Sequence, residues 1–175
     1  MMQHPLELVP STVRKPLFYF LFVFTLLIFG AFRQLDQPLR TSAAPGGIVS
    51  FELAGTLDAS QEMINSWDEN ARLFAAFGLG LDYLFMPVYA LTLSLGLLLV
   101  GNEKVNWYQN LTKWMGWGMF IAALFDAVEN YALWQSLTGN VNPMFPQIAA
   151  LCAMIKFALL ISGILVLLVG RFARK

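Results

Sequence analysis

Four long apolar stretches dominate this sequence and limit what it can fold into. They cover residues 17–32, 73–100, 114–137 and 146–170. An α-helix needs about 20 apolar residues to cross the hydrocarbon core of a bilayer, and the last three stretches meet that length. The first is shorter, but basic residues on its flanks can extend their charged ends to the lipid headgroups. The sequence therefore predicts an all-α integral membrane protein built as a four-transmembrane-helix bundle.

The composition fits a bilayer as the solvent. Only 13% of the 175 residues are charged and 58% are hydrophobic, whereas soluble domains usually carry about 25% charged residues. Eleven basic residues balance eleven acidic ones, so no excess of positive charge favours nucleic acid as a partner. The single histidine, His4, lies in the N-terminal tail, and Cys152 is the only cysteine. We therefore expect no histidine-based site, no cofactor and no intrachain disulfide.

A basic flank followed by an apolar run is also the pattern of a cleavable signal peptide. Residues 17–32 follow Arg14 and Lys15, so this alternative has to be weighed. The residues directly after the run, RQLDQPLR, contain no small-x-small cleavage site, and TSAA at 41–44 lies rather far from it. An uncleaved first helix is the better interpretation, and residues 1–175 then form a single membrane domain.

The distribution of Lys and Arg predicts the orientation, because these residues collect on the cytoplasmic side of a membrane. Three segments share most of the basic charge, namely the N-terminal tail, the loop between the second and third stretches, and the C-terminal tail. Their basic residues are Arg14, Lys15, Lys104, Lys113, Arg171, Arg174 and Lys175. The loop at 33–72 instead holds more acidic than basic residues. We expect a multi-pass protein of the cell (inner) membrane with both termini cytoplasmic and the loop at 33–72 outside.

The external loop at 33–72 shows two patterns. Residues 46–55 alternate apolar and polar side chains, which is the period of a half-buried strand. From about Asp58 to Arg72 the spacing becomes helical, and Asp58 can cap that helix with Gln61 three residues later. The apolar face of the helix contains Met63, Ile64, Trp67 and Ala71. We predict a small external strand–helix cap, with an amphipathic helix on the outer membrane surface over the mouth of the bundle.

Charged and polar residues inside the apolar stretches are the strongest functional signal. Asp126, Glu129 and Asn130 have i, i+3, i+4 spacing, so they share one face of the third helix. The second stretch adds Asp82 and the fourth adds Lys156. From a rise of about 1.5 Å per residue, these groups lie at similar depths, from the midplane outward. Each charge facing lipid would cost roughly 2.5 to 3.5 kcal/mol, so we expect the side chains to face one another inside the bundle.

We do not expect the three carboxyls of this cluster to be ionised at the same time. Three carboxyls share one base in a medium of low dielectric, so like charges should leave at least one of the acids protonated near neutral pH. Lys156 would also repel a cation, and no histidine is at hand, so we expect no metal site at these carboxylates.

Two segments of the chain resemble a known family. LDYLFMPVY at 81–89 and FDAVEN at 125–130, preceded by the pattern FELAG…SW, resemble uncharacterised bacterial four-span membrane proteins with D-x-x-F-x-x-x-Y and D-x-x-E-N motifs. The resemblance covers most of the chain beyond residue 45. It implies the four-span architecture. It implies no chemistry, because no activity is established for that family.

The function we favour is binding of a small or amphipathic ligand in a buried polar pocket, with proton coupling as an option. The residues of this site are Asp82, Asp126, Glu129, Asn130, Lys156, Tyr83 and Tyr89. A structural alternative is that the cluster only holds the helices in register.

Two other functions remain open. One is an accessory or scaffold subunit, in which the partners are further copies of the chain or a larger membrane complex. The other is a lipid-modifying enzyme that uses a carboxyl as general acid or base. No nucleophile–base pair is visible in the sequence, so enzymatic activity is neither indicated nor excluded.

Overall fold

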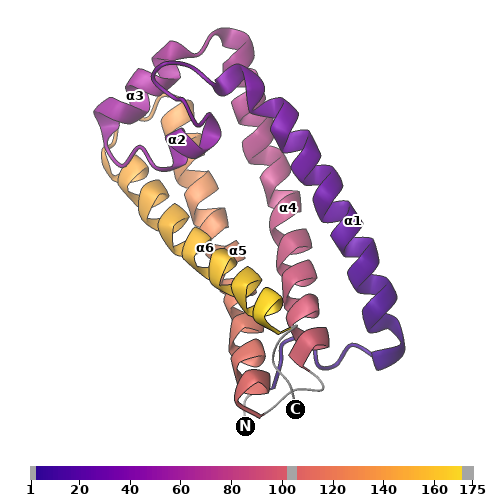
Figure 1. Ribbon diagram of the computed structural model, residues 1–175. Coiled ribbons are helices and arrows are strands. Elements are labelled where there is room, and N and C mark those ends of the chain that lie inside the picture. The colour runs from indigo at the N-terminus through magenta and orange to yellow at the C-terminus, as the bar shows by residue number, and fades with distance from the viewer. Residues whose placement is uncertain (1–2, 102–105, 171–175) are drawn as a thin grey trace. The chain divides into compact units, whose positions relative to one another are not determined.

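The computed structural model describes residues 3–101 and 106–170 (Figure 1). All regular secondary structure in these ranges is helical. In chain order the elements are α1 (Ser11–Leu35), the 3-10 helix η1 (Gln37–Leu39), α2 (Ile48–Glu52), α3 (Leu57–Ser66), α4 (Glu69–Gly101), α5 (Asn106–Leu137) and α6 (Met144–Val169). Four basic residues used to predict the orientation lie outside the described residues, and these are Lys104, Arg171, Arg174 and Lys175.

The four predicted apolar stretches correspond to the four long helices α1, α4, α5 and α6. By length and composition, three segments within the described ranges could cross a membrane, and these are Ser11–Leu39, Glu69–Gly101 and Met144–Val169. The remaining long helix, α5, has 32 residues, but its mean hydropathy is below that of α1, α4 and α6. The described residues are therefore all-helical and of the membrane type, and α5 is not among the three segments that could cross a membrane by length and composition.

The chain forms two compact units, and each unit combines several segments. Unit 1 contains Met1–Leu26, Pro87–Leu124 and Lys156–Lys175, and unit 2 contains Leu27–Met86 and Phe125–Ile155. Each of the four long helices contributes one part to each unit. In α4 the division falls at Pro87, a proline inside the helix.

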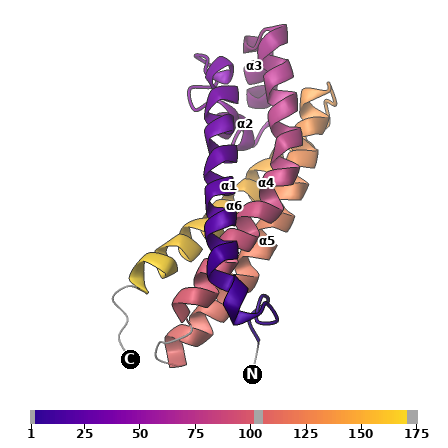
Figure 2. The ribbon, with the colours of Figure 1, turned by 90° about the vertical axis from the view of Figure 1, so that its right-hand side faces the viewer.

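Unit 2 has a core that joins the segment between α1 and α4 to the long helices. We call residues 36–68 the cap segment. Figures 1 and 2 show α2 and α3 of this segment next to the start of α4. The buried apolar residues of the core are Leu39, Ala44, Phe51, Ile64, Trp67, Ala71, Ala75, Leu79, Ala132, Leu133 and Ala149. The cap segment is therefore packed on α4, α5 and α6 of the same unit.

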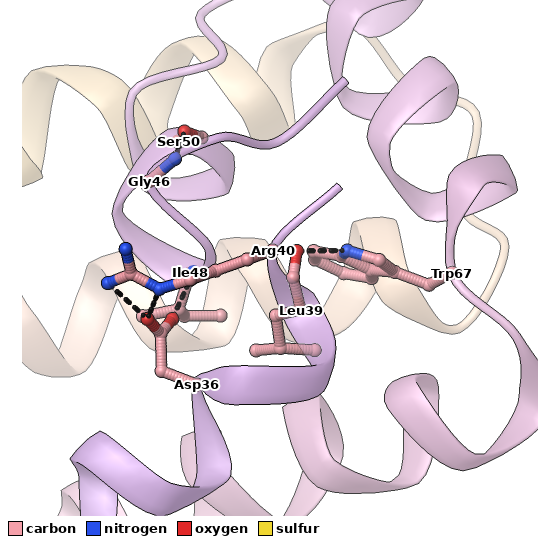
Figure 3. Close-up of polar contacts among 7 residues, drawn as sticks. All are labelled: Asp36, Leu39, Arg40, Gly46, Ile48, Ser50 and Trp67. Carbon is pink, nitrogen blue, oxygen red and sulfur yellow. Dashed lines mark hydrogen bonds and ion pairs between the residues drawn. The ribbon is translucent and has the colours of Figure 1, made fainter. Parts of the chain in front are cut away.

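The predicted strand at 46–55 is wrong, because residues Ile48–Glu52 form the helix α2. Gly47 precedes α2 with φ = +62°, a conformation that glycine adopts without strain. Asp36 then accepts a hydrogen bond from the first backbone N–H of α2, that of Ile48, at 2.7 Å (Figure 3). The same carboxylate binds the Arg40 guanidinium at 2.9 Å. A carboxylate from twelve residues upstream thus caps α2, and the apolar alternation carries no information about this contact.

The amphipathic helix predicted from about Asp58 to Arg72 is present only in part, as α3, because α3 ends at Ser66 and Arg72 lies on α4. Thr56, and not Asp58, is the N-cap residue, and its Oγ1 accepts a hydrogen bond from Ala59 N at 3.3 Å. The helix ends before Trp67, whose backbone is extended. Three residues of the predicted apolar face are buried in the core of unit 2, namely Ile64 on α3, Trp67 directly after it, and Ala71 on α4.

Unit 1 contains an ordered contact that no sequence pattern indicates. His4 is buried, and its Nδ1 accepts a hydrogen bond from Leu6 N at 3.1 Å. A Cβ atom at Gly116 would collide with the imidazole ring. Next to this glycine, Trp117 donates a hydrogen bond from Nε1 to the carbonyl of Gln3 at 3.1 Å. The N-terminal segment is therefore docked on α5, and burial lowers the pKa of His4 to about 4.

Candidate functional site

The structure places most of the predicted site residues in unit 2. Asp82 and Tyr83 lie on α4, and Asp126, Glu129 and Asn130 lie on α5, all within that unit. Tyr89 and Lys156 belong to unit 1. The candidate site consists of four polar side chains of unit 2, namely Asp82, Asp126, Glu129 and Asn130. We call these four residues the polar layer.

A direct hydrogen bond joins α4 to α5 in the polar layer. Asn130 Nδ2 donates to Asp82 Oδ2 at 2.8 Å, across 48 residues of sequence. The Asn130 side chain is 1% exposed, and its Oδ1 has no hydrogen-bond partner among the described residues. Leaving a buried acceptor unpaired costs about 1 to 3 kcal/mol. The layer therefore presents an acceptor that a hydrogen-bond donor would stabilise.

The two acids of α5 lie on the same buried face as Asn130. Asp126 is 2% exposed and Glu129 is 0% exposed, as their helical spacing predicts. Neither side chain lacks an interaction partner, and the same holds for Asp82. Burial of a carboxylate is costly unless it is paired, hydrogen-bonded or protonated. Each of these two buried acids, one turn apart on α5, must therefore be paired, hydrogen-bonded or protonated.

Tyr83 contributes to the same helix pair through the backbone. Its hydroxyl donates a hydrogen bond to the carbonyl of Ala127 at 3.2 Å, and its ring is half exposed. Ala127 directly follows Asp126 on α5. Tyr83 thus ties α4 to α5 next to the acids.

Lys156 is buried in unit 1, with a side chain that is 5% exposed. Its ammonium lies 4.8 Å from the ring centroid of Phe157, within the range of a cation–π contact. Lys156 has at least one further interaction besides this contact. The predicted pairing of Lys156 with the carboxyls stays a prediction. Tyr89 is also buried, and its predicted role as a hydrogen-bonding neighbour of the acids likewise stays a prediction.

The helix α5 turns polar side chains inward and large apolar side chains outward. Its buried polar residues are Thr112, Asp126, Glu129, Asn130 and Ser136. Its exposed apolar residues recur every three or four positions from Trp114 onward, with Trp107 one heptad earlier, and they are Trp107, Trp114, Trp117, Ile121, Leu124, Val128, Tyr131 and Trp134. A helix on the surface of a soluble protein has the opposite pattern. The polar layer therefore lies on the inner face of a helix whose outer face is apolar.

No protein family, curated protein or solved structure matches this chain. The resemblance to bacterial four-span proteins therefore stays a prediction. Within residues 3–101 and 106–170, no group of three or more His, Cys, Asp or Glu side chains is arranged to hold a metal ion.

Proposed function

We propose that the chain is a multi-pass protein of the cell inner membrane that crosses the bilayer with α1, α4, α5 and α6. The exposed aromatic residues of α5 support the fourth crossing. Trp114 and Trp134 are 20 residues apart, which corresponds to about 30 Å along a helix, the thickness of the hydrocarbon core. Tryptophan is enriched at both membrane–water interfaces. The low mean hydropathy of α5 then follows from its buried polar face and not from contact with water.

The topology can be tested with reporter fusions at residues 5, 55, 105 and 175. Four crossings with cytoplasmic termini give the sequence inside, outside, inside, inside. If α5 does not cross, only three crossings remain and the fusion at residue 175 reads outside. That single result would overturn the four-span architecture.

We further propose that the polar layer binds a small or amphipathic ligand that donates hydrogen bonds, such as an ammonium or a hydroxyl group. The observation that carries this proposal is Asn130, which uses its amide nitrogen on Asp82 and leaves a buried oxygen without a donor. If the polar layer were purely structural, it would stabilise the helix packing only slightly, since interhelical hydrogen bonds in membranes contribute about 0.6 kcal/mol on average. The buried acids on the same face of α5, Asp126 and Glu129, can also take up or release a proton when the ligand binds.

Copurifying material provides the test. The protein is extracted in a mild detergent, and small molecules that remain bound are identified by mass spectrometry. We expect a compound that is retained by the wild type and lost from Asn130→Leu. The matched control is Thr112→Val, which removes another buried polar group of α5, whose hydroxyl donates to Gln109 O within the same helix.

The thermal unfolding midpoint of each variant has to be measured alongside. A folded Asn130→Leu protein that retains the same compounds as the wild type would contradict the proposal. It would leave a structural role for the polar layer, as in a subunit of a larger membrane complex.

A further inference from the structure

A separate pocket in unit 2 offers a second binding site that shares no residue with the polar layer. It has a volume of about 490 Å³ and is open to the outside. Its walls come from α3, the first turn of α4, and the end of α5 with the turn that follows. Pockets of roughly 300 to 1,000 Å³ are typical of small-ligand sites. This pocket therefore has room for a small molecule or a headgroup.

One charged side chain lines this pocket, and it is Arg72. Its Nε donates a hydrogen bond to the carbonyl of Ile64 at 3.1 Å, which fixes the plane of the guanidinium against the end of α3. Arg72 has no ion pair with a carboxylate in the described part of the chain. An oriented guanidinium with two nitrogens left over is suited to bidentate binding of an oxyanion.

The other lining residues complete a site of mixed character. Uncharged polar groups lie on both walls, and they are Ser60, Gln61, Asn65, Ser136, Thr138 and Asn140. The hydroxyls of Ser136 and Thr138 donate to backbone carbonyls of α5, so the other four are the available donors. Four apolar side chains lie between them, and they are Leu57, Ile64, Leu137 and Val141. The lining is therefore more polar than apolar, which suits a ligand group that is itself charged.

We propose that this pocket binds an oxyanion, a phosphate or carboxylate group, with Arg72 as its counter-ion. The oxyanion belongs either to an amphiphile, whose chain would contact the apolar residues, or to a small free anion. The cap segment then has a function of its own, because α3 supplies one wall and positions the guanidinium.

Chemical modification of arginine tests the proposal on the intact wild-type protein in neutral detergent. Phenylglyoxal modifies accessible guanidinium groups, and peptide mass spectrometry gives the rate at each arginine. Dodecyl phosphate is the amphiphilic probe, inorganic phosphate is the free anion, and dodecanol is the uncharged control. Arg33 is the internal reference, since it is exposed, lies in the same unit and is absent from the pocket.

We expect dodecyl phosphate to slow the modification of Arg72 by about tenfold or more, while Arg33 reacts at an unchanged rate. Equal protection by inorganic phosphate assigns the site to a free anion, and protection by dodecyl phosphate alone assigns it to an amphiphile. No protection of Arg72 by either probe overturns the proposal. Equal protection of Arg33 also overturns it, because the anion would then only accumulate at the micelle surface.

Binding measurements on variants give an independent check. Arg72→Gln should weaken the binding of the effective probe by about tenfold to a hundredfold, the effect of one charge-assisted contact. Arg33→Gln removes an equal charge from the same unit and should leave the affinity unchanged. Equal affinities for the two variants would contradict the assignment of Arg72.

Discussion

Trp67 Nε1 donates a hydrogen bond to the backbone carbonyl of Leu39 at 2.8 Å, and both residues are buried (Figure 3). The contact joins the residue after α3 to the end of η1 across 28 residues of sequence. The Trp67 ring also packs edge-on against Phe51 of α2, with ring centroids 5.2 Å apart. One side chain therefore holds three parts of the cap segment together on the core of unit 2.

Removal of the indole N–H of Trp67 should destabilise the protein, although it removes only one hydrogen-bond donor. Trp67→Phe leaves the buried Leu39 carbonyl without its donor, so we expect a loss of about 1 to 3 kcal/mol in the free energy of unfolding. Trp67→Ala adds a cavity and should cost about 3 to 5 kcal/mol. Denaturant unfolding in detergent measures both. Trp134→Phe, at an exposed position, is the control, and equal losses for the two Phe variants would contradict the role of the hydrogen bond.

Gly47 should be intolerant of any side chain. Its φ is +62°, and a Cβ atom there would collide with the carboxylate of Asp36, which caps α2. We expect Gly47→Ala to destabilise the protein by more than about 1 kcal/mol. Gly78, in the helical part of the same unit, has open space around it, so Gly78→Ala should be neutral or slightly stabilising. Unfolding midpoints that fall equally in the two variants would show that Gly47 has no special conformation.

The sequence predicts features that depend on local spacing and misses those that depend on distant contacts. The long helices follow from apolar runs, and the buried face of α5 follows from the i, i+3, i+4 spacing of Asp126, Glu129 and Asn130. The helix α2 depends on Asp36, twelve residues upstream. The burial of His4 depends on a missing side chain at Gly116. Such contacts leave no periodic signal.

The N-cap residue of α3 is another feature that the sequence does not predict correctly. Thr56 and Asp58 are both good N-cap residues, and they are only two positions apart. The observed cap is Thr56, whose carbonyl also accepts the hydrogen bond from Ser60 N at 3.1 Å. Propensity alone cannot rank two such residues, so the predicted cap is off by two positions, although the presence of a helix in this segment is predicted.

The docked N-terminal segment should make stability depend on pH through His4. Burial lowers the pKa of His4 to about 4, Arg14 and Lys113 act in the same direction, and Glu7 opposes them. The unfolded chain, with a pKa near 6.5, then binds more protons than the folded protein between about pH 6.5 and pH 4. Stability from this group is present above pH 6.5 and is lost as the pH falls toward 4.

The comparison of wild type with His4→Asn isolates this effect, because asparagine does not titrate and can still accept the Leu6 N–H. We expect the unfolding midpoint of the wild type to fall further between pH 6.5 and pH 4 than that of the variant. Parallel curves would show that His4 is protonated equally in the folded and unfolded states.

We expect Lys156 to pair with the buried acids, because the membrane depths estimated from the sequence are similar for these residues. Lys156→Met removes one charge and should cost about 3 to 5 kcal/mol if it leaves buried carboxyls uncompensated. Asp126→Asn in the same protein should then recover part of that loss. The free energies of unfolding of the two single variants and the double variant measure the coupling. Strictly additive losses would show that the two residues do not interact.

The cap segment should control access to the polar layer, because both belong to unit 2 and share its helices. Two residues of the core of unit 2 lie close to the acids in sequence. Leu79 precedes Asp82 by three residues on α4, and Leu133 follows Glu129 by four residues on α5. Positions three or four apart lie on one face of a helix. The core that holds the cap segment is therefore one turn away from the carboxyls, and we expect opening of the cap to expose that face.

Trp67→Ala should accordingly raise the reactivity of Asp82 or Glu129 toward a water-soluble carbodiimide. If opening of the cap becomes easier by about 1.4 kcal/mol, the modification rate increases about tenfold. Leu95→Ala is the control, because it places a cavity in the core of unit 1 and reports on general loss of stability. Peptide mass spectrometry reads the modification at each carboxyl. Complete protection of both carboxyls in the wild type and in Trp67→Ala would contradict a ligand pocket and favour a purely structural polar layer.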